Sequence, residues 1–154
     1  MKILSLDKKG ILEYQQNRDP YLMIDFASEI IPGISSKGYK DFKKDEWFFK
    51  VHWKNDPNVP GMLQIESLVQ MCALSILTIP GNKGMVVYLV AANKLKFTKK
   101  ILPGQRLELD TKIINFKRGI ANCEGSGKVD DQLACKAEFN LILPEEIKKY
   151  NLDK

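Results

Sequence analysis

One segment of the sequence, residues 61–79, constrains the fold more than any other. Its residues, GMLQIESLVQMCALSILTI, include a single charged side chain, Glu66, and lie between Pro60 and the Pro80-Gly81 pair. Proline is tolerated at the start of a helix and stops one at its end, so the segment is predicted to be a helix. Apolar residues occupy nearly its whole circumference, and a helix that is apolar all round is a buried one. The rest of the chain must therefore wrap it.

The remaining segments can supply a sheet for this purpose. In the C-terminal half, the segments that alternate or run apolar as strands do are residues 84–92, 106–116, 120–129 and 133–143. In the N-terminal half, a short helix is expected at residues 6–16 and strands are expected at residues 21–31, 34–42 and 46–53. The tail after Leu143 is expected to be a frayed or short helical end. These elements predict an α+β fold, with a long antiparallel sheet curled around one buried helix in a single domain of residues 1–154.

Charge and cysteine patterns exclude several classes of protein. Polar residues interrupt the longest apolar stretch, and charges stand where a signal peptide needs an apolar run, so a cytoplasmic protein without a membrane span is expected. Cys72, Cys123 and Cys135 are odd in number and widely spaced, which fits neither a metal site nor a disulfide framework. Cys72 is expected to be a small buried hydrophobe. The net charge of +5 favours an acidic partner, but no aromatic-studded basic stripe is present, so nucleic acid is not expected.

The one carboxylate of the apolar helix follows soon after the only histidine of the chain. His52 precedes the helix by a short loop, and Glu66 lies more than one turn inside it among apolar neighbours. Either residue alone has an ordinary explanation, because a histidine can end a strand and a glutamate can favour the positive end of a helix dipole. The two together indicate chemistry, because a buried carboxylate is costly unless it is protonated or hydrogen-bonded.

These residues are the groups that an elimination of water requires. Desolvation is expected to raise the pKa of Glu66, and Gln70, one turn further on the same helix face, can orient it. Histidine is a common general base, so His52 can take an acidified carbon-bound proton. Backbone N–H groups at Gly61 can stabilise the enolate-like oxygen of a thioester, because glycine lets a carbonyl approach closely. A base, an oxyanion donor and an acid together predict β-elimination of water.

The segment FFKVHWKNDPNVPGMLQIESLVQ, residues 48–70, resembles the active-site segment of the hot-dog-fold 3-hydroxyacyl-(acyl carrier protein) dehydratases of bacterial type II fatty acid synthesis. The residues that match that pattern in register are Phe48, Phe49, His52, Pro57, Pro60, Gly61, Glu66 and Gln70. Upstream, NRDPYLMID resembles the entry strand of the family, and downstream KLKFTKKILPGQRLEL resembles its Pro-Gly-Asp segment. The resemblance covers roughly residues 8–143.

The resemblance implies a hot-dog fold and roles for three residues. His52 would be the base, Glu66 the acid or water-orienting group, and Gly61 an oxyanion donor, without a metal or a redox cofactor. The substrate would be a 3-hydroxyacyl chain linked through phosphopantetheine to acyl carrier protein, and the product a trans-2-enoyl thioester. Family members are homodimers in which the histidine of one subunit faces the carboxylate of the other, and the dimers often form hexamers. A second, isomerising branch carries aspartate at the acid position, so Glu66 indicates the branch that only dehydrates.

The chain departs from the family pattern around the histidine. Val51 replaces a glycine, and Trp53-Lys54 replaces Phe-Pro. Asn17 and Asp19 replace a histidine and an aromatic residue in the entry segment. These changes leave open the acyl chain length, the pathway and two alternatives. One alternative is a hot-dog thioesterase that hydrolyses the same thioesters, and the other is a non-catalytic subunit that binds an acyl carrier protein.

Basic residues gather near the segment NKLKFTKKILPGQR. They are Lys94, Lys96, Lys99, Lys100 and Arg106. They are candidates for docking an acidic carrier protein, although an ordinary solvated strand edge carries lysines as well.

Overall fold

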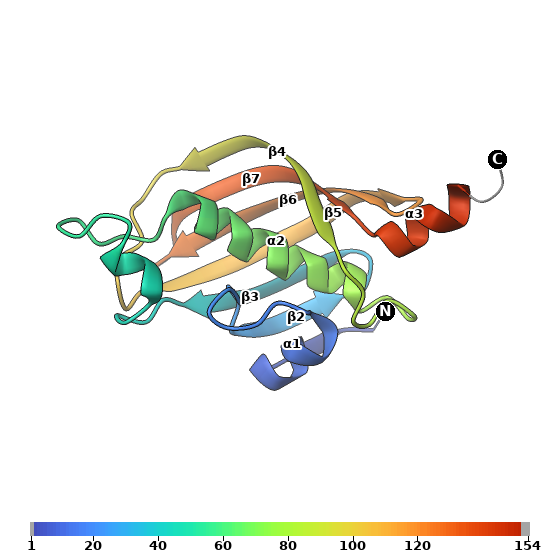
Figure 1. Cartoon of the computed structure of the whole chain (residues 1–154), viewed down its shortest axis with the longest axis horizontal. Helices are drawn as coiled ribbons and strands as arrows, with labels where there is room; N and C mark the ends of the chain where they lie inside the picture. Colours follow the sequence, from blue (N-terminus) through green and yellow to red (C-terminus); the bar gives the residue numbers. More distant parts are fainter. Residues whose placement is uncertain (1, 152–154) are drawn as a thin grey trace.

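The structure of the protein is a computed structural model that describes residues 2–151. Within this range, seven strands join one antiparallel sheet, and the longest helix, α2 (Gly61–Leu77), lies across one face of it (Figure 1). The strands are β1 (Leu4–Leu6), β2 (Phe26–Ile31), β3 (Ser35–Asp41), β4 (Tyr88–Phe97), β5 (Arg106–Lys117), β6 (Ile120–Val129) and β7 (Gln132–Ile142). Their order in space is β1-β2-β3-β5-β6-β7-β4. The predicted α+β fold is confirmed.

Helix α2 is buried on almost all sides, as its apolar pattern predicted. Every residue from Ser67 to Leu77 is buried, and the helix contacts β2, β3, β5, β6 and β7. Gly38 on β3 allows the helix and β2 to approach closely, because a Cβ atom there would lie 1.9 Å from the Phe26 carbonyl oxygen and 2.7 Å from Met71 Cε. Ser36 Oγ, also on β3, donates to the Met71 carbonyl oxygen at 2.5 Å. The sheet therefore holds the helix by packing and by a hydrogen bond to its backbone.

The strand predicted at residues 46–53 is wrong. This stretch contains a 3₁₀ helix, η1 (Trp47–Lys50), followed by the loop that carries His52. The consecutive residues Phe48 and Phe49 are both buried. A strand would turn successive side chains to opposite faces, so it could not bury both rings on one side. The tight helical turn does so, and their ring centroids lie 4.8 Å apart.

Other element boundaries also differ from the predictions. The strand expected at residues 21–31 begins at Phe26, because the backbone of Tyr21 and Met23 bonds to the side chain of Gln70 and not to a neighbouring strand. The short strand β1 was not predicted, and the strand expected at residues 84–92 runs from Tyr88 to Phe97. The N-terminal helix α1 is shorter than expected (Lys8–Tyr14), and α2 ends at Leu77 instead of residue 79.

The C-terminal tail is helical as far as Asn151, and the cysteines are buried. The tail forms a short helix, α3 (Pro144–Asn151), and residues 152–154 lie outside the described part of the chain. All three cysteines are free and buried, as expected for Cys72. Burial raises the pKa of the Cys135 thiol to about 12. The cysteines therefore act as small core residues.

Between residues 2 and 151, no helix has both the length and the apolar character needed to cross a lipid bilayer.

Candidate active site

The acid candidate, Glu66, lies in the second turn of α2 and is held by Gln70. Gln70 Nε2 donates to Glu66 Oε1 at 2.9 Å and also to the Tyr21 carbonyl oxygen at 2.9 Å. Gln70 Oε1 accepts from the Met23 N–H at 2.7 Å. Because Gln70 is buried and both ends of its amide are bonded, its side chain has one defined orientation. The segment 21–23 thus fixes Gln70, and Gln70 fixes Glu66.

The surroundings of Glu66 favour its protonated form. Burial raises the pKa of the Glu66 carboxyl, and the hydrogen bond from Gln70 opposes this only in part. Burial and the charge of Glu66 together raise the pKa of the Tyr21 phenol, so Tyr21 also lies near this carboxyl. A carboxyl group with a raised pKa keeps its proton to higher pH and can give it to a leaving group.

The base candidate, His52, follows η1 and is half-buried. Its backbone N–H donates to the Phe48 carbonyl oxygen at 2.9 Å, which continues the helical turn into the loop. The His52 Nδ1 atom lies 3.1 Å from the Asn58 carbonyl oxygen. A carbonyl can only accept, so this contact assigns the proton to Nδ1 and leaves the Nε2 lone pair free in the neutral ring. Nε2 is therefore the atom that can act as a base.

The oxyanion candidate, Gly61, is the first residue of α2. The preceding residue, Pro60, makes no side-chain capping hydrogen bond, and the first N–H groups of a helix have no partner within it. A Cβ atom at Gly61 would lie 2.9 Å from Phe97 Cε1 and Cζ on the edge strand β4. Glycine is thus required by the approach of an aromatic ring, and its amide lies at the positive end of the helix dipole.

Three of the four predicted site residues fall into two separately bonded groups within one chain. Glu66 and Gln70 are bonded to each other, whereas His52 is bonded to Asn58. Across residues 2–151, no hydrogen bond or ion pair joins His52 to Glu66. Asn58 orders the His52 side chain, and Gln70 orders the Glu66 side chain.

A hollow at the start of α2 contains a residue that the sequence analysis missed. It is lined by Gly61, Gln64 and Phe97, together with Lys99 and Lys100 from the connection between β4 and β5. Gln64 is buried, and its Nε2 donates to the Val59 carbonyl oxygen at 3.1 Å. Its Oε1 has no partner among the described residues. The signal for Gln64 in the sequence is a polar amide inside an otherwise apolar helix.

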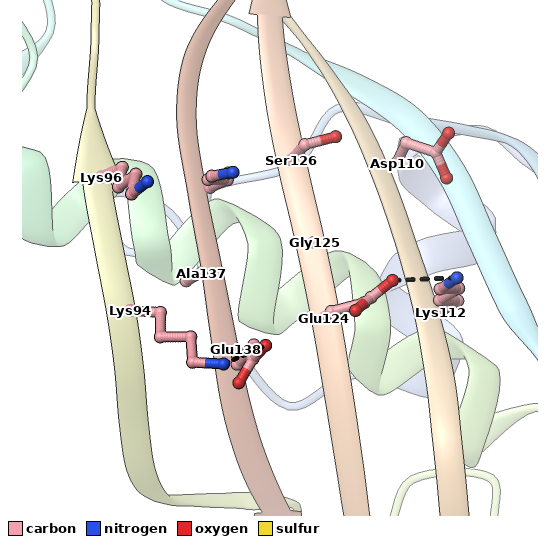
Figure 2. A pocket seen from close by; sticks show the side chains of 10 residues that line it. Lys94, Lys96, Asp110, Lys112, Glu124, Gly125, Ser126, Ala137 and Glu138 are labelled. Atoms are coloured by element: carbon pink, nitrogen blue, oxygen red, sulfur yellow. Dashed lines mark hydrogen bonds and ion pairs between the residues drawn. The ribbon is translucent and has the colours of Figure 1, made fainter.

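The predicted basic cluster is divided between three places. Lys99 and Lys100 line the hollow at the start of α2. Arg106 on β5 is paired with Asp41 at 2.7 Å. Lys94 and Lys96 line a larger hollow on the face of the sheet opposite α2 (Figure 2).

The larger hollow is lined by four lysines and three acids. Lys94 lies 3.4 Å from Glu138, and Lys112 lies 2.9 Å from Glu124, so half of its lysines are paired with acids. None of the four predicted site residues lines it. Of the four, Gly61 lines the hollow at the start of α2. Nowhere in the described chain do three His, Cys, Asp or Glu side chains gather as a group that could hold a metal ion.

Comparison with a family model matches residues 16–138 to a FabA-like domain. The chain belongs to the FabA-like family. The FabA-like match includes His52, Gly61, Glu66 and Gln70, and it confirms the resemblance read from residues 48–70.

Two relatives of this FabA-like chain share one name. It is 35% identical over 136 residues to a protein of Clostridium novyi, "3-hydroxyacyl-[acyl-carrier-protein] dehydratase FabZ", with 88% of this chain and 96% of the relative covered. The protein of the same name from Bacillus subtilis is 32% identical, with 91% of this chain and 99% of the relative covered. Among solved structures, the dehydratase heterocomplex ApeI:P from Xenorhabdus doucetiae shares the fold at a TM-score of 0.74 and 10% identity, covering 94% of this chain and 97% of that chain.

Proposed function

We propose that this FabA-like chain removes water from a 3-hydroxyacyl thioester carried by acyl carrier protein and forms the trans-2-enoyl thioester. The observation that carries the proposal is that the candidate acid and the candidate base are each held in one orientation by a hydrogen bond. Glu66 is a carboxyl of raised pKa held by Gln70, and His52 is an imidazole whose Nδ1 is engaged by Asn58. The relatives named 3-hydroxyacyl-[acyl-carrier-protein] dehydratase support the same reaction.

The proposed reaction uses each group once. His52 Nε2 takes a proton from C2 of the acyl chain, and the electron pair moves toward the thioester carbonyl. The Gly61 N–H donates to the developing oxyanion, an interaction typically worth about 3–4 kcal/mol. Electrons then return to form the C2–C3 double bond, the C3–O bond breaks, and Glu66 gives its proton to the departing hydroxyl. The enzyme regains its starting state when a proton passes from His52 to Glu66, directly or through water.

The proposed site needs a second copy of the chain. His52 and Glu66 have separate partners within one chain, and β4 stands at the edge of the sheet, hydrogen-bonded to β7 on one side. Its exposed apolar side chains are Tyr88, Leu89, Val90 and Phe97. A long apolar edge strand is a template for pairing with another chain. In the proposed homodimer, two β4 strands meet and the His52 of one subunit faces the Glu66 of its partner; three such dimers would form the proposed hexamer.

The hollow at the start of α2 fits the arm that carries the substrate. Phosphopantetheine presents amide N–H groups, and Gln64 Oε1 is a buried acceptor that lacks a donor in the described chain. Lys99 lines the same hollow and carries a charge that suits an acidic carrier protein, whereas Lys100 is paired with Asp56 at 2.7 Å. The proposal places the reaction in the cytoplasm.

The test is turnover of a 3-hydroxyacyl chain on acyl carrier protein, followed by the absorbance of the enoyl thioester. Wild-type protein should form the enoyl product, and His52→Ala and Glu66→Gln should each lower kcat by about 10²–10⁴-fold. A parallel assay for released thiol distinguishes dehydration from thioester hydrolysis. Release of thiol without enoyl product would replace the proposal with a thioesterase, and binding of the carrier without either product would indicate a non-catalytic subunit.

A further inference from the structure

Strand β3 carries a buried lysine, Lys40, whose charged end lies near acidic residues before and after the strand. Lys40 is only 5% exposed. Its Nζ atom lies 3.5 Å from Asp25 Oδ2 and 3.4 Å from Glu46 Oε1, and both carboxylate side chains are themselves largely buried. Lysine is almost never buried unless it is paired. The three residues form an ion triad that the proposed chemistry does not use.

The Asp25 side of the triad leads to the acid. Asp25 Oδ2 also accepts from the Asp41 N–H at 2.7 Å, so the carboxylate is fixed against β3. Two residues earlier in the chain, the Met23 N–H donates to Gln70 Oε1 at 2.7 Å. Gln70 in turn donates to Glu66. Asp25 thus ends the short segment that orients Gln70, and through it Glu66.

The Glu46 side of the triad leads to the base. Glu46 is the residue immediately before η1, and its carbonyl oxygen accepts from the Phe49 N–H at 3.2 Å. The carbonyl oxygen of Phe48, within η1, accepts from the His52 N–H. Phe42, whose ring centroid is 5.9 Å from Lys40 Nζ, packs edge-to-face on Phe48. Lys40 is therefore fixed to the start of the element that presents His52.

We infer that Lys40 is a positioning residue that links the base-bearing element η1 to the segment that orients Glu66. The inference rests on the proposed function. Burying a charged triad is costly, and well-packed apolar residues of similar volume can often replace one without loss of stability. The triad can be retained because it forms a short link between two functional elements. Because the proposed site combines His52 of one subunit with Glu66 of the partner, Lys40 also joins the two sites of a dimer.

The test exploits the single histidine of the chain. Protein labelled with ¹⁵N-histidine gives imidazole signals from His52 alone, and their shifts report which ring nitrogen carries the proton. Glu46→Gln keeps the shape of the side chain and removes its charge, and Lys40→Met removes the ammonium group. Asp41→Asn is the matched control, because it breaks the exposed pair with Arg106 on the same strand.

Wild type and Asp41→Asn should show neutral His52 protonated at Nδ1. Glu46→Gln and Lys40→Met should show a mixture of both tautomers, because η1 no longer holds the ring against Asn58. Their kcat should fall by about 10- to 100-fold, the cost of a small misplacement of a catalytic group, while KM changes less than threefold. The tautomer is read without substrate, so it reports on Lys40 even if the wild type proves not to be a dehydratase.

Two outcomes overturn the inference. One is a folded Glu46→Gln variant with the wild-type tautomer and, where the wild type is active, the wild-type kcat. The other is an equal change in Asp41→Asn, which would mean that any lost charge on β3 disturbs His52. If Lys40→Met does not fold, Glu46→Gln decides alone, since it keeps the volume of the side chain and replaces the charged contact to Lys40 by a weaker neutral one.

Discussion

Gln70 Nε2 lies 2.9 Å from Glu66 Oε1 and 2.9 Å from the carbonyl oxygen of Tyr21, so one amide group joins the only charged residue of α2 to the segment before β2. The bond to Glu66 matters for the proposed chemistry in two ways. It selects one orientation of the carboxyl, and it lowers the pKa of Glu66 against the larger opposite effect of burial. The raised pKa is therefore limited by Gln70.

Gln70→Met should shift the pH dependence of the reaction. Without the amide, the pKa of Glu66 rises further, and the proposed acid stays protonated to higher pH. Activity falls as pH rises through that pKa, so the alkaline limb of the kcat profile should move to higher pH. The maximal kcat should nevertheless fall, because the carboxyl is no longer oriented. A profile from pH 5 to 10 measures both effects.

The same change should destabilise the fold. It leaves the buried Met23 N–H without its partner, and an unsatisfied buried group costs about 1–3 kcal/mol. Gln16→Met is the control, since Gln16 makes an exposed hydrogen bond to Gly84. An unmoved alkaline limb in Gln70→Met would contradict the assignment of Glu66 as the acid.

Glu66→Gln should stabilise the fold at high pH. A carboxyl whose pKa is raised in the folded state binds its proton more tightly there, so its contribution to stability is full at low pH and is lost as pH rises through the folded-state pKa. The unfolding free energy of Glu66→Gln should therefore exceed that of wild type increasingly with pH. The gain should be about 1.4 kcal/mol for each unit by which folding raises the pKa. Urea unfolding at several pH values measures it, and a gain that shrinks with pH would contradict the burial argument.

Gly61→Ala should lower activity more than stability. The added Cβ atom would lie 2.9 Å from the Phe97 ring and would push it over the start of α2, whereas alanine in a helix is favoured over glycine by about 1 kcal/mol. Adding Phe97→Leu to Gly61→Ala should recover part of kcat by removing the clash. The four proteins form a double-mutant cycle, and simple additivity of their kcat effects would contradict contact between residues 61 and 97 as the cause.

Carrier docking should depend on Lys99 and not on Lys96. Lys99 lines the hollow at the start of α2, and Lys96 lines the hollow on the opposite face of the sheet. Lys99→Glu should raise KM for the carrier-linked substrate about tenfold, a cost of about 1.4 kcal/mol, and should weaken its dependence on salt. Lys96→Glu is the control of equal charge change. An equal rise in KM for both variants would place docking elsewhere.

The sequence predicted α2 and its surroundings well, because a helix that is apolar all round can only be buried. It also predicted Gln70 beside Glu66, since residues four apart on a helix share one face. The strand expected over residues 46–53 failed because two adjacent phenylalanines are buried together in a 3₁₀ turn. Apolar composition alone does not distinguish a strand from a 3₁₀ turn.

Polar contacts between residues far apart in the chain could not be predicted from the sequence. Lys40 looks like an ordinary charged residue of a strand, and its partners Asp25 and Glu46 lie in other segments, so its burial follows from the tertiary fold alone. Gln64 is similar, because only the structure shows that one end of its amide is bonded to Val59 while the other has no described partner. Local patterns indicated the proposed acid, its partner Gln70 and the proposed base, but not the ion triad around Lys40.

The most direct measurement is complementation between two inactive variants. His52→Ala and Glu66→Gln are unfolded together in equal amounts, refolded, and assayed for formation of the enoyl thioester. If His52 of one subunit works with Glu66 of its partner, half of the random dimers are mixed and each contains one intact site, so the mixture should recover about a quarter of the wild-type activity. Activity no greater than that of the separate variants, with mixed dimers demonstrated by mass, would contradict a site shared between subunits.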